Sequence, residues 1–275
     1  MRLKIGAVSY LNSKPLVEGM EGTPADDFEV GFDLPSRLAD RLAGEELDVA
    51  LIPVIEAIVN PDYTIVSNAC IACHGPVWSV KLMSRVPGSE IKTVALDEGS
   101  RTSCALTRVL LDRKFGVQPE CVPLTIDQDW TTAETDAVLI IGDRAMKATD
   151  PEFPWVWDLG ETWNQWTGKP FVFAVWAARP GSDLERLKSI LTRSRDLGLK
   201  NIDKISTEHA ANYGLSKNEC LKYLGEHLHF VLGDKEKSGM NLFFKYAAEL
   251  SLIPQLTQLQ FHDCQTNSQP TSPTA

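Results

Sequence analysis

The chain has 275 residues, 43% of them hydrophobic and 23% charged, which is the composition of a globular protein with one large domain or two lobes. Its formal net charge of −10 argues against a nucleic-acid partner, because phosphate binding needs a basic face. No apolar run is long enough for a membrane span and no signal-peptide pattern opens the chain. We therefore expect a cytoplasmic protein whose six cysteines are reduced.

Short apolar runs alternate with helical stretches over the first 180 residues. Gly, Pro or polar residues bound each run, as is typical of buried strands. The runs that we predict as strands are residues 3–8, 28–32, 48–52, 77–83, 93–96, 121–124, 137–141 and 171–177. Four helices are predicted between these strands. The first begins near Pro15, the second ends near Gly44, the third spans residues 101–115 and the fourth follows Gly142-Asp143. This alternation predicts an α/β fold with a mainly parallel sheet.

The last third of the chain is predicted to be helical. Ser182-Asp183 precede apolar residues at helical spacing, which indicates a capped helix that ends near Gly198. Two or three further helices fill residues 202–252. Residues 265–275 have no apolar pattern and are predicted to be a disordered tail.

A candidate site follows the first predicted strand. Asn12 comes after residues 3–8 and shortly before Pro15, which is placed for the first turn of a helix. Open α/β sheets bind small ligands at the carboxyl ends of their strands, and a helix start favours an anion. Asn12 can donate and accept hydrogen bonds, whereas Ser9 and Tyr10 are candidates for lining the same cleft. Without further context, an asparagine here is a turn residue and a tyrosine is packing.

A second candidate follows the strand at residues 93–96. The turn combines a glycine, which lets a ligand approach the backbone, with hydroxyls and the amides of a helix start. Its residues are Gly99, Ser100, Arg101, Thr102 and Ser103. We predict a carboxylate site there, although Ser100 alone would be explained as a helix cap. Gly142 and Asp143 repeat the geometry at another strand end, where Asp143 alone would also be a cap.

Three other patterns are not expected to carry function. Cys70-Ile-Ala-Cys73-His74 fits the C-x-x-C-H pattern of haem attachment, but attachment follows export, and a second ligand pair for zinc is missing. His227 and His229 lack a third ligand nearby in the sequence and are expected to be structural. The aromatic residues between 155 and 173 are predicted to pack in the core, with one or two rings facing a ligand.

Several blocks of sequence resemble one known family. The segment Gly6-Ala-Val-Ser-Tyr-Leu-Asn-Ser-Lys-Pro-Leu16 meets the pattern G-x-V-x-Y-L-N-x-x-P-L at every specified position. Further matching blocks lie within residues 36–56, 70–84, 96–103, 136–143 and 158–173, in the family's order. On these residues the chain resembles the chorismate dehydratases, which begin the futalosine route to menaquinone, up to about Pro180. His74 and Trp78 depart from the residues usual for the family at the rim of its cleft.

The resemblance implies an α/β, two-lobed fold like that of type II periplasmic binding proteins, with a ligand cleft between the lobes. Residues 1–84 and 179–264 would form the first lobe, and residues 85–178 the second. It further implies that the small-molecule partner is chorismate, which loses water to give 3-[(1-carboxyvinyl)oxy]benzoate. No metal, organic cofactor, nucleic acid or membrane is expected, and the oligomeric state is not predicted.

The resemblance also implies roles for the candidate residues. Asn12 would be catalytic and steady the departing hydroxyl, while the turn at 99–103 would receive a substrate carboxylate. Ser9, Tyr10, Ser84, Gly142 and Asp143 would line the cleft. The motifs offer no obvious histidine or lysine base near Asn12 and the 99–103 turn, so we hypothesise that the side-chain carboxylate of chorismate takes the C3 proton. Asp143 and Glu56 are the alternative bases.

Two other functions stay open from the sequence. One is a non-catalytic solute-binding or sensor protein of the same fold, since a fold does not settle a function. The other is the later enzyme of the same pathway and fold that makes dihydroxynaphthoate. Incubation with chorismate and analysis of the product separates these functions.

Overall fold

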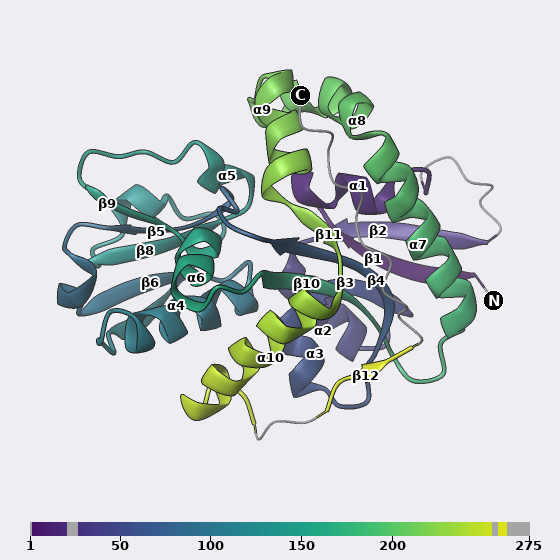
Figure 1. Ribbon diagram of the computed structural model, residues 1–275, viewed down its shortest axis with the longest axis horizontal. Helices are drawn as coiled ribbons and strands as arrows, with labels where there is room; N and C mark the ends of the chain where they lie inside the picture. The colour runs from purple at the N-terminus through teal and green to yellow at the C-terminus, as the bar shows by residue number, and fades with distance from the viewer. Residues whose placement is uncertain (1, 21–26, 255–257, 263–275) are drawn as a thin grey trace.

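Two α/β lobes make up the computed structural model, which describes residues 2–20, 27–254 and 258–262 (Figure 1). Each lobe is built around its own mixed sheet, so the predicted two-lobed α/β class is confirmed. The predicted tail at residues 265–275 lies outside the described residues. In the part of the chain that the structure describes, no helix combines the length and the apolar character that a bilayer span requires.

The first sheet takes its strands from the regions before and after the second lobe in the sequence. Their order is β11-β4-β10-β3-β1-β2, with β12 beside β4. β3 and β10 are buried at every residue, and this explains their continuous apolar sequences. The strands are β1 (Leu3–Val8), β2 (Phe28–Asp33), β3 (Val49–Pro53), β4 (Thr64–Cys73), β10 (Phe171–Ala178), β11 (His229–Val231) and β12 (Gln260–Phe261).

The second sheet has the order β7-β6-β8-β5-β9 and comes from one continuous stretch of chain. Its central strand β8 is buried throughout. The strands are β5 (Val80–Ser84), β6 (Thr93–Asp97), β7 (Glu120–Leu124), β8 (Ala137–Ile141) and β9 (Trp155–Asp158).

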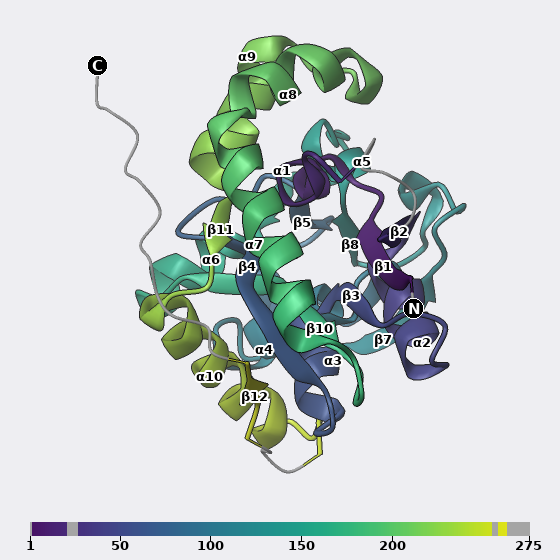
Figure 2. The ribbon, with the colours of Figure 1, turned by 90° about the vertical axis from the view of Figure 1, so that its right-hand side faces the viewer.

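Helices cover both sheets. The long α7 packs on β4 and on the short α1, and Figure 2 shows it crossing the first sheet. α10 packs on β10 and also reaches α4 of the second lobe. The helices are α1 (Lys14–Val17), α2 (Pro35–Ala43), α3 (Val54–Val59), α4 (Arg101–Arg113), α5 (Asp143–Met146), α6 (Leu159–Thr167), α7 (Leu184–Lys200), α8 (Ile202–His209), α9 (Lys217–Lys222) and α10 (Asp234–Glu249).

Caps explain where several helices begin. Asp183 accepts a hydrogen bond from the Arg186 amide and caps α7, as its position before the apolar pattern predicted. Asp158 caps α6 by accepting from the Glu161 amide. The aromatic residues between 155 and 173 are only partly in the core: Trp163 is fully buried, whereas Trp155 is 45% exposed.

The predicted lobe boundaries place two strands in the wrong lobe. They put β5 in the first lobe and β10 in the second, whereas β5 belongs to the second sheet and β10 to the first. β5 pairs with β8 and β9, and β10 pairs with β3 and β4. The chain therefore changes sheet within residues 74–79 and 159–170, and not near residues 85 and 178. The Pro-Gly break after Ser84 is a turn inside the second lobe, because such residues mark a turn without indicating which sheet follows. We propose to divide the lobes at these two crossovers.

The sheets are mixed and not mainly parallel. β10 is antiparallel to both of its neighbours, and so is β5. β4, ten residues long, was not among the predicted strands. Polar Ser67 and Asn68 interrupt its apolar run, and the fold buries both by hydrogen-bonding them, to Thr192 and Arg195.

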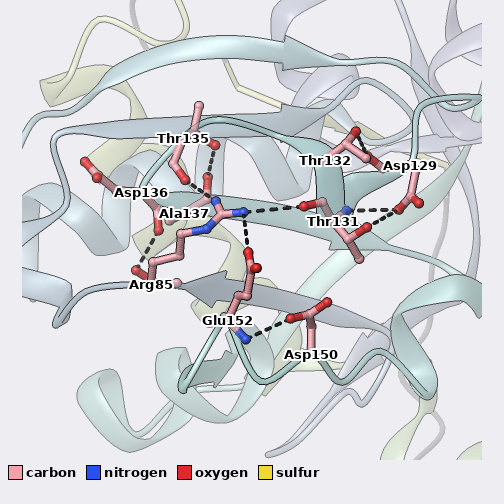
Figure 3. A network of polar contacts seen from close by, with 10 residues as sticks. Arg85, Asp129, Thr131, Thr132, Thr135, Asp136, Ala137, Asp150 and Glu152 are labelled. Carbon is pink, nitrogen blue, oxygen red and sulfur yellow. Dashed lines mark hydrogen bonds and ion pairs between the residues drawn. The ribbon is translucent and has the colours of Figure 1, made fainter.

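An arginine stabilises the end of the second sheet where β8 begins (Figure 3). The Arg85 guanidinium donates to the carbonyls of Thr131 and Thr135 and pairs with Glu152 at 3.7 Å. It also lies 4.0 Å from the centre of the Phe153 ring. This end of β8 is opposite to the end at Ile141, where the candidate site lies.

Candidate active site

A cavity of about 40 Å³ lies between the lobes, at the carboxyl ends of β1, β3 and β8. Asn12 and the turn after β6 both line it, so the two motifs that the sequence indicated meet in one pocket. Its polar lining is Tyr10, Asn12, Ser79, Ser100 and Ser103. Its other lining residues are Val8, Pro35, Pro53, Ile71, Val77, Val80, Ile141, Gly142, Phe173 and Ala174.

Two polar atoms at this pocket are buried without a hydrogen-bond partner among the described residues. They are the Tyr10 hydroxyl and the Asn12 Oδ1. A buried polar atom without a partner costs free energy, so natural proteins keep few of them. Both atoms therefore indicate a ligand that supplies the missing hydrogen bonds.

The Asn12 amide is oriented by Tyr223, which reaches the pocket from the short π-helical turn after α9. The fully buried Tyr223 hydroxyl donates to Ser79 Oγ at 2.8 Å. Burial raises the pKa of Tyr223, and this rise is opposed by its hydrogen bonds with Ser79 and Asn12. With its NH₂ group on Tyr223, Asn12 is left with Oδ1 as a free acceptor. Neither Tyr223 nor Ser79 was predicted as a site residue. Ser79 stands in a matching block, whereas no local pattern singles out Tyr223.

Tyr10 belongs to the first lobe but lies against the second. A Cβ at Gly142 would stand 2.9 Å from the Tyr10 ring, and one at Gly99 would stand 3.2 Å from its hydroxyl. Gly142 also has a φ of +71°, so glycine is needed at this position for two reasons. Burial, with the nearby Asp97 and Asp143, raises the pKa of Tyr10 well above its ordinary value. Tyr10 therefore stays a neutral phenol that can donate a hydrogen bond.

The turn after β6 presents hydroxyls at the start of α4. Ser100 caps this helix, since its Oγ accepts from the Ser103 amide at 3.3 Å, and the two hydroxyl oxygens lie 3.0 Å apart. The capping role thus exists, and both side chains also line the pocket. The buried Asp97 holds the two strand tips together by accepting from the amides of Gly99 and Ile141. Asp97 was not predicted as a site residue.

Arg101 and Thr102 connect the lobes and do not line the pocket. Thr102 is fully buried, and its Oγ1 accepts from the Ile55 amide at 3.3 Å. Arg101 forms ion pairs with Asp40 at 2.7 Å and Glu56 at 3.3 Å across the lobe interface. Burial raises the pKa of Glu56 although Arg101 opposes the change. The first-lobe partners come from α2 and α3, so these contacts connect the two lobes.

Asp143 also connects the lobes. Its Oδ1 accepts from the Leu11 amide at 3.2 Å. Burial raises the pKa of Asp143 to about 6, although the Leu11 amide and Lys14 oppose the change. Asp143 thus lies beside the backbone that carries Asn12 without being a pocket-lining residue.

Ser9 and Ser84, predicted to line the cleft, lie elsewhere. Ser9 is exposed at the end of β1. The Ser84 hydroxyl is buried and donates to the carbonyls of Val86 and Asp136. β5 is antiparallel to β8, so the carboxyl end of β5 is at the edge of the sheet remote from Ile141. The amino end of β5 lies at the pocket instead. Val80 is the first residue of β5 and Ser79 precedes it, and both line the pocket.

The pocket walls carry no charged side chain. Of the described residues that line the cavity, none is Lys, Arg, His, Cys, Asp or Glu. An anion there would be held by hydroxyls, backbone amides and the start of the 13-residue helix α4. Cys70 and Cys73 are fully buried in β4, and burial raises the pKa of both thiols.

The fold is of the periplasmic-binding-protein-like class. Protein AF1704 from Archaeoglobus fulgidus is similar in structure, with a TM-score of 0.75 at 16% identity, over 92% of this chain and 98% of that one. The periplasmic aliphatic sulphonate binding protein SsuA from Escherichia coli has a TM-score of 0.60 at 16% identity, over 93% and 94% of the two chains.

Sequence comparison then gives the family. The chain belongs to the menaquinone biosynthesis family, which matches residues 3–249. It is 28% identical over 257 residues to the chorismate dehydratase of Thermus thermophilus, covering 87% of this chain and 93% of that protein. It is 26% identical over 252 residues to the chorismate dehydratase of Campylobacter jejuni, covering 90% and 98%. The resemblance found in the motifs is confirmed.

Proposed function

We propose that this chain is a chorismate dehydratase, a hydro-lyase that converts chorismate to 3-[(1-carboxyvinyl)oxy]benzoate and water in menaquinone biosynthesis. The family membership and the two named relatives support this function. The observation that carries it is the pair of unpartnered atoms, Tyr10 Oη and Asn12 Oδ1, buried in the pocket that Ser100 and Ser103 also line.

The substrate is proposed to bind as the lobes close. The cavity of about 40 Å³ has room for only a few water molecules, each of which needs about 10–15 Å³ by the same measure, and it is too small for chorismate. The lobes must therefore part to admit the substrate, and their contacts at Thr102, Arg101 and Asp143 form again around it. Closure removes water and fixes one conformation of a substrate that has competing reactions.

Within the closed pocket, each polar group has one proposed role. The neutral Tyr10 phenol donates to a substrate carboxylate, together with the hydroxyls of Ser100 and Ser103. Asn12 Oδ1 accepts a hydrogen bond from the C4 hydroxyl and fixes the direction in which it leaves. Tyr223 and Ser79 hold the Asn12 amide for this task.

The elimination is proposed to be assisted by the substrate. The side-chain carboxylate of chorismate takes the proton from C3, the electrons of the C3–H bond form the new ring double bond, and the C4–O bond breaks. The hydroxyl leaves as water by taking up the proton that the carboxylate removed from C3, so the carboxylate is restored and the ring becomes aromatic. Both alternative bases are engaged elsewhere, since Asp143 accepts from the Leu11 amide and Glu56 pairs with Arg101.

The test follows turnover and binding separately. Purified protein is incubated with chorismate, and the aromatic product is identified by chromatography and mass. Asn12→Ala is expected to lose turnover, while Asp143→Asn keeps it. If Asp143→Asn alone binds chorismate normally and loses turnover, Asp143 is the base and substrate assistance is wrong. Chorismate that is bound and recovered unchanged would instead support a binding protein, and activity in a dihydroxynaphthoate-forming step would support the later enzyme.

We also propose that the protein acts on the futalosine route in the cytoplasm. The five cysteines in the described residues are free thiols, which fits a reducing compartment. Cell fractionation with a specific antibody tests the location. Loss of menaquinone in a deletion strain, restored by supplying the product of this reaction, tests the route.

A further inference from the structure

A second cluster of polar side chains lies away from the pocket. His74 directly follows β4, His229 begins β11, and Glu236 stands in the first turn of α10. Among the described residues, their ligand atoms all lie within 4.8 Å of one another. β11 pairs with β4, and Figure 1 shows α10 following β11 along the chain, so the cluster joins separate segments of the sequence.

Both imidazoles face the same carboxylate oxygen. The Nε2 of His74 is 2.6 Å from Glu236 Oε1, and the Nε2 of His229 is 3.8 Å from it. The two rings are tilted by 32° with their centres 4.3 Å apart. Around a tetrahedral zinc ion with bonds of about 2.0–2.1 Å, neighbouring ligand atoms are about 3.4 Å apart. The two spacings to Glu236 Oε1 lie on either side of that value, and no ligand atom of the three is more than 4.8 Å from another, so modest side-chain rotations are needed to reach ligand spacing.

The surroundings of the cluster match those of a ligand set. Glu236 is only 4% exposed, and its second oxygen accepts from the Gly233 amide at 2.9 Å. The His229 ring also hydrogen-bonds to the backbone of Val231. Such outer contacts orient metal ligands. The His74 side chain is 48% exposed, which leaves an entry path and room for water as a fourth ligand.

We propose that His74, His229 and Glu236 bind one Zn²⁺ ion, with water as the fourth ligand. Two imidazoles and one carboxylate form a donor set that suits zinc. The ion stabilises the structure, because the cluster shares no residue with the pocket lining. It fixes the start of the crossover at residues 74–79 to the first lobe, while Asp158 of the second lobe accepts from the amides of Val77 and Trp78.

Because the cluster lies outside the pocket, the proposal does not depend on the proposed reaction, and its test uses no chorismate.

The experiment titrates the untagged full-length protein with Zn²⁺ after chelator treatment and dialysis. A competing chromophoric chelator reports affinity, elemental analysis reports stoichiometry, and the thermal midpoint reports stabilisation. The expected result is one zinc per chain and a raised midpoint. His74→Ala and Glu236→Gln are expected to weaken binding at least tenfold. His227→Ala is the matched control, since this nearby histidine contacts the Pro76 carbonyl and is outside the cluster.

Two results would overturn the proposal. One is the absence of zinc binding at a stoichiometry of one, and the other is equal affinity in the unsubstituted protein and the His74→Ala variant. His74 is half-exposed, so this variant is expected to fold even if removal of the buried Glu236 charge disturbs the protein. Co²⁺ in place of Zn²⁺ gives an independent reading: intense visible bands that His74→Ala abolishes support the site, and their persistence in that variant contradicts it.

Discussion

Replacing Tyr10 by phenylalanine is expected to stabilise the ligand-free protein and to weaken its binding of chorismate. The Tyr10 hydroxyl is buried and has no hydrogen-bond partner among the described residues. Removing it removes an uncompensated polar group, while the ring keeps its packing against Gly142. The same hydroxyl is the proposed donor to a substrate carboxylate, so stability and binding should change in opposite directions.

The magnitudes follow from the state of that hydroxyl. An unpartnered buried hydroxyl costs about 1–3 kcal/mol, which its removal returns to the free energy of unfolding. With an unfolding entropy of about 2.1 cal/mol/K per residue, this raises the melting temperature by about 2–5 °C. A hydrogen bond to a charged group contributes about 1.5–3 kcal/mol, so its loss weakens chorismate binding roughly 10- to 100-fold.

Tyr223→Phe is the matched control. It also removes a phenol hydroxyl from a buried tyrosine, but the Tyr223 hydroxyl donates to Ser79 Oγ at 2.8 Å. Its removal leaves a polar group unpaired, so the melting temperature is expected to fall. Calorimetry without ligand and titration with chorismate measure the two effects. A lower melting temperature for Tyr10→Phe, or unchanged chorismate binding, would refute the argument from the unpartnered atom.

Three further substitutions test the contacts around the pocket. Thr102→Val removes the acceptor of the Ile55 amide, and the loss of about 1–2 kcal/mol from the closed state should lower kcat/KM about tenfold in steady-state kinetics. Asp143→Asn should raise the melting temperature more at pH 7.5 than at pH 4.5. The folded pKa of Asp143, about 6, lies above its unfolded value, so stability is lost as the pH rises through that window. Gly142→Ala should lower the free energy of unfolding by about 1–3 kcal/mol, and with it the melting temperature, because residue 142 has a positive φ and a Cβ there would contact Tyr10.

Each of these has a contrary outcome. Unchanged kcat/KM for Thr102→Val would mean that the Ile55 contact does not stabilise the catalytic state. An equal gain in melting temperature at both pH values would show that Asp143 titrates normally. A Gly142→Ala variant as stable as the unsubstituted protein would contradict the close approach of Tyr10.

The meeting of Asn12 with the 99–103 turn was predictable from the sequence. Each motif directly follows a short apolar strand and precedes a helix, and such junctions lie at the ligand-binding edge of an α/β sheet. Strand direction was not predictable from local pattern. Ser84 also ends an apolar strand, but β5 is antiparallel to β8, which moves Ser84 to the opposite edge.

The residues that support Asn12 were beyond local pattern. Tyr223 is 211 positions away in a helical stretch, and its position at the pocket depends on how the helices after β10 fold back on the first lobe. β4 was missed because Ser67 and Asn68 break its apolar run, and their burial depends on Thr192 and Arg195 in α7. Tertiary contacts of this kind decide a strand where local composition is ambiguous.

The origin of each sheet has a consequence for how the chain folds during synthesis. All five strands of the second sheet lie within residues 80–158, so this lobe can assemble as soon as that stretch has left the ribosome. The first sheet waits much longer, because β10 is inserted between β3 and β4. Until β10 emerges, the facing edges of those two strands are open to mispairing, and the earliest-made part of the protein is the last to be completed.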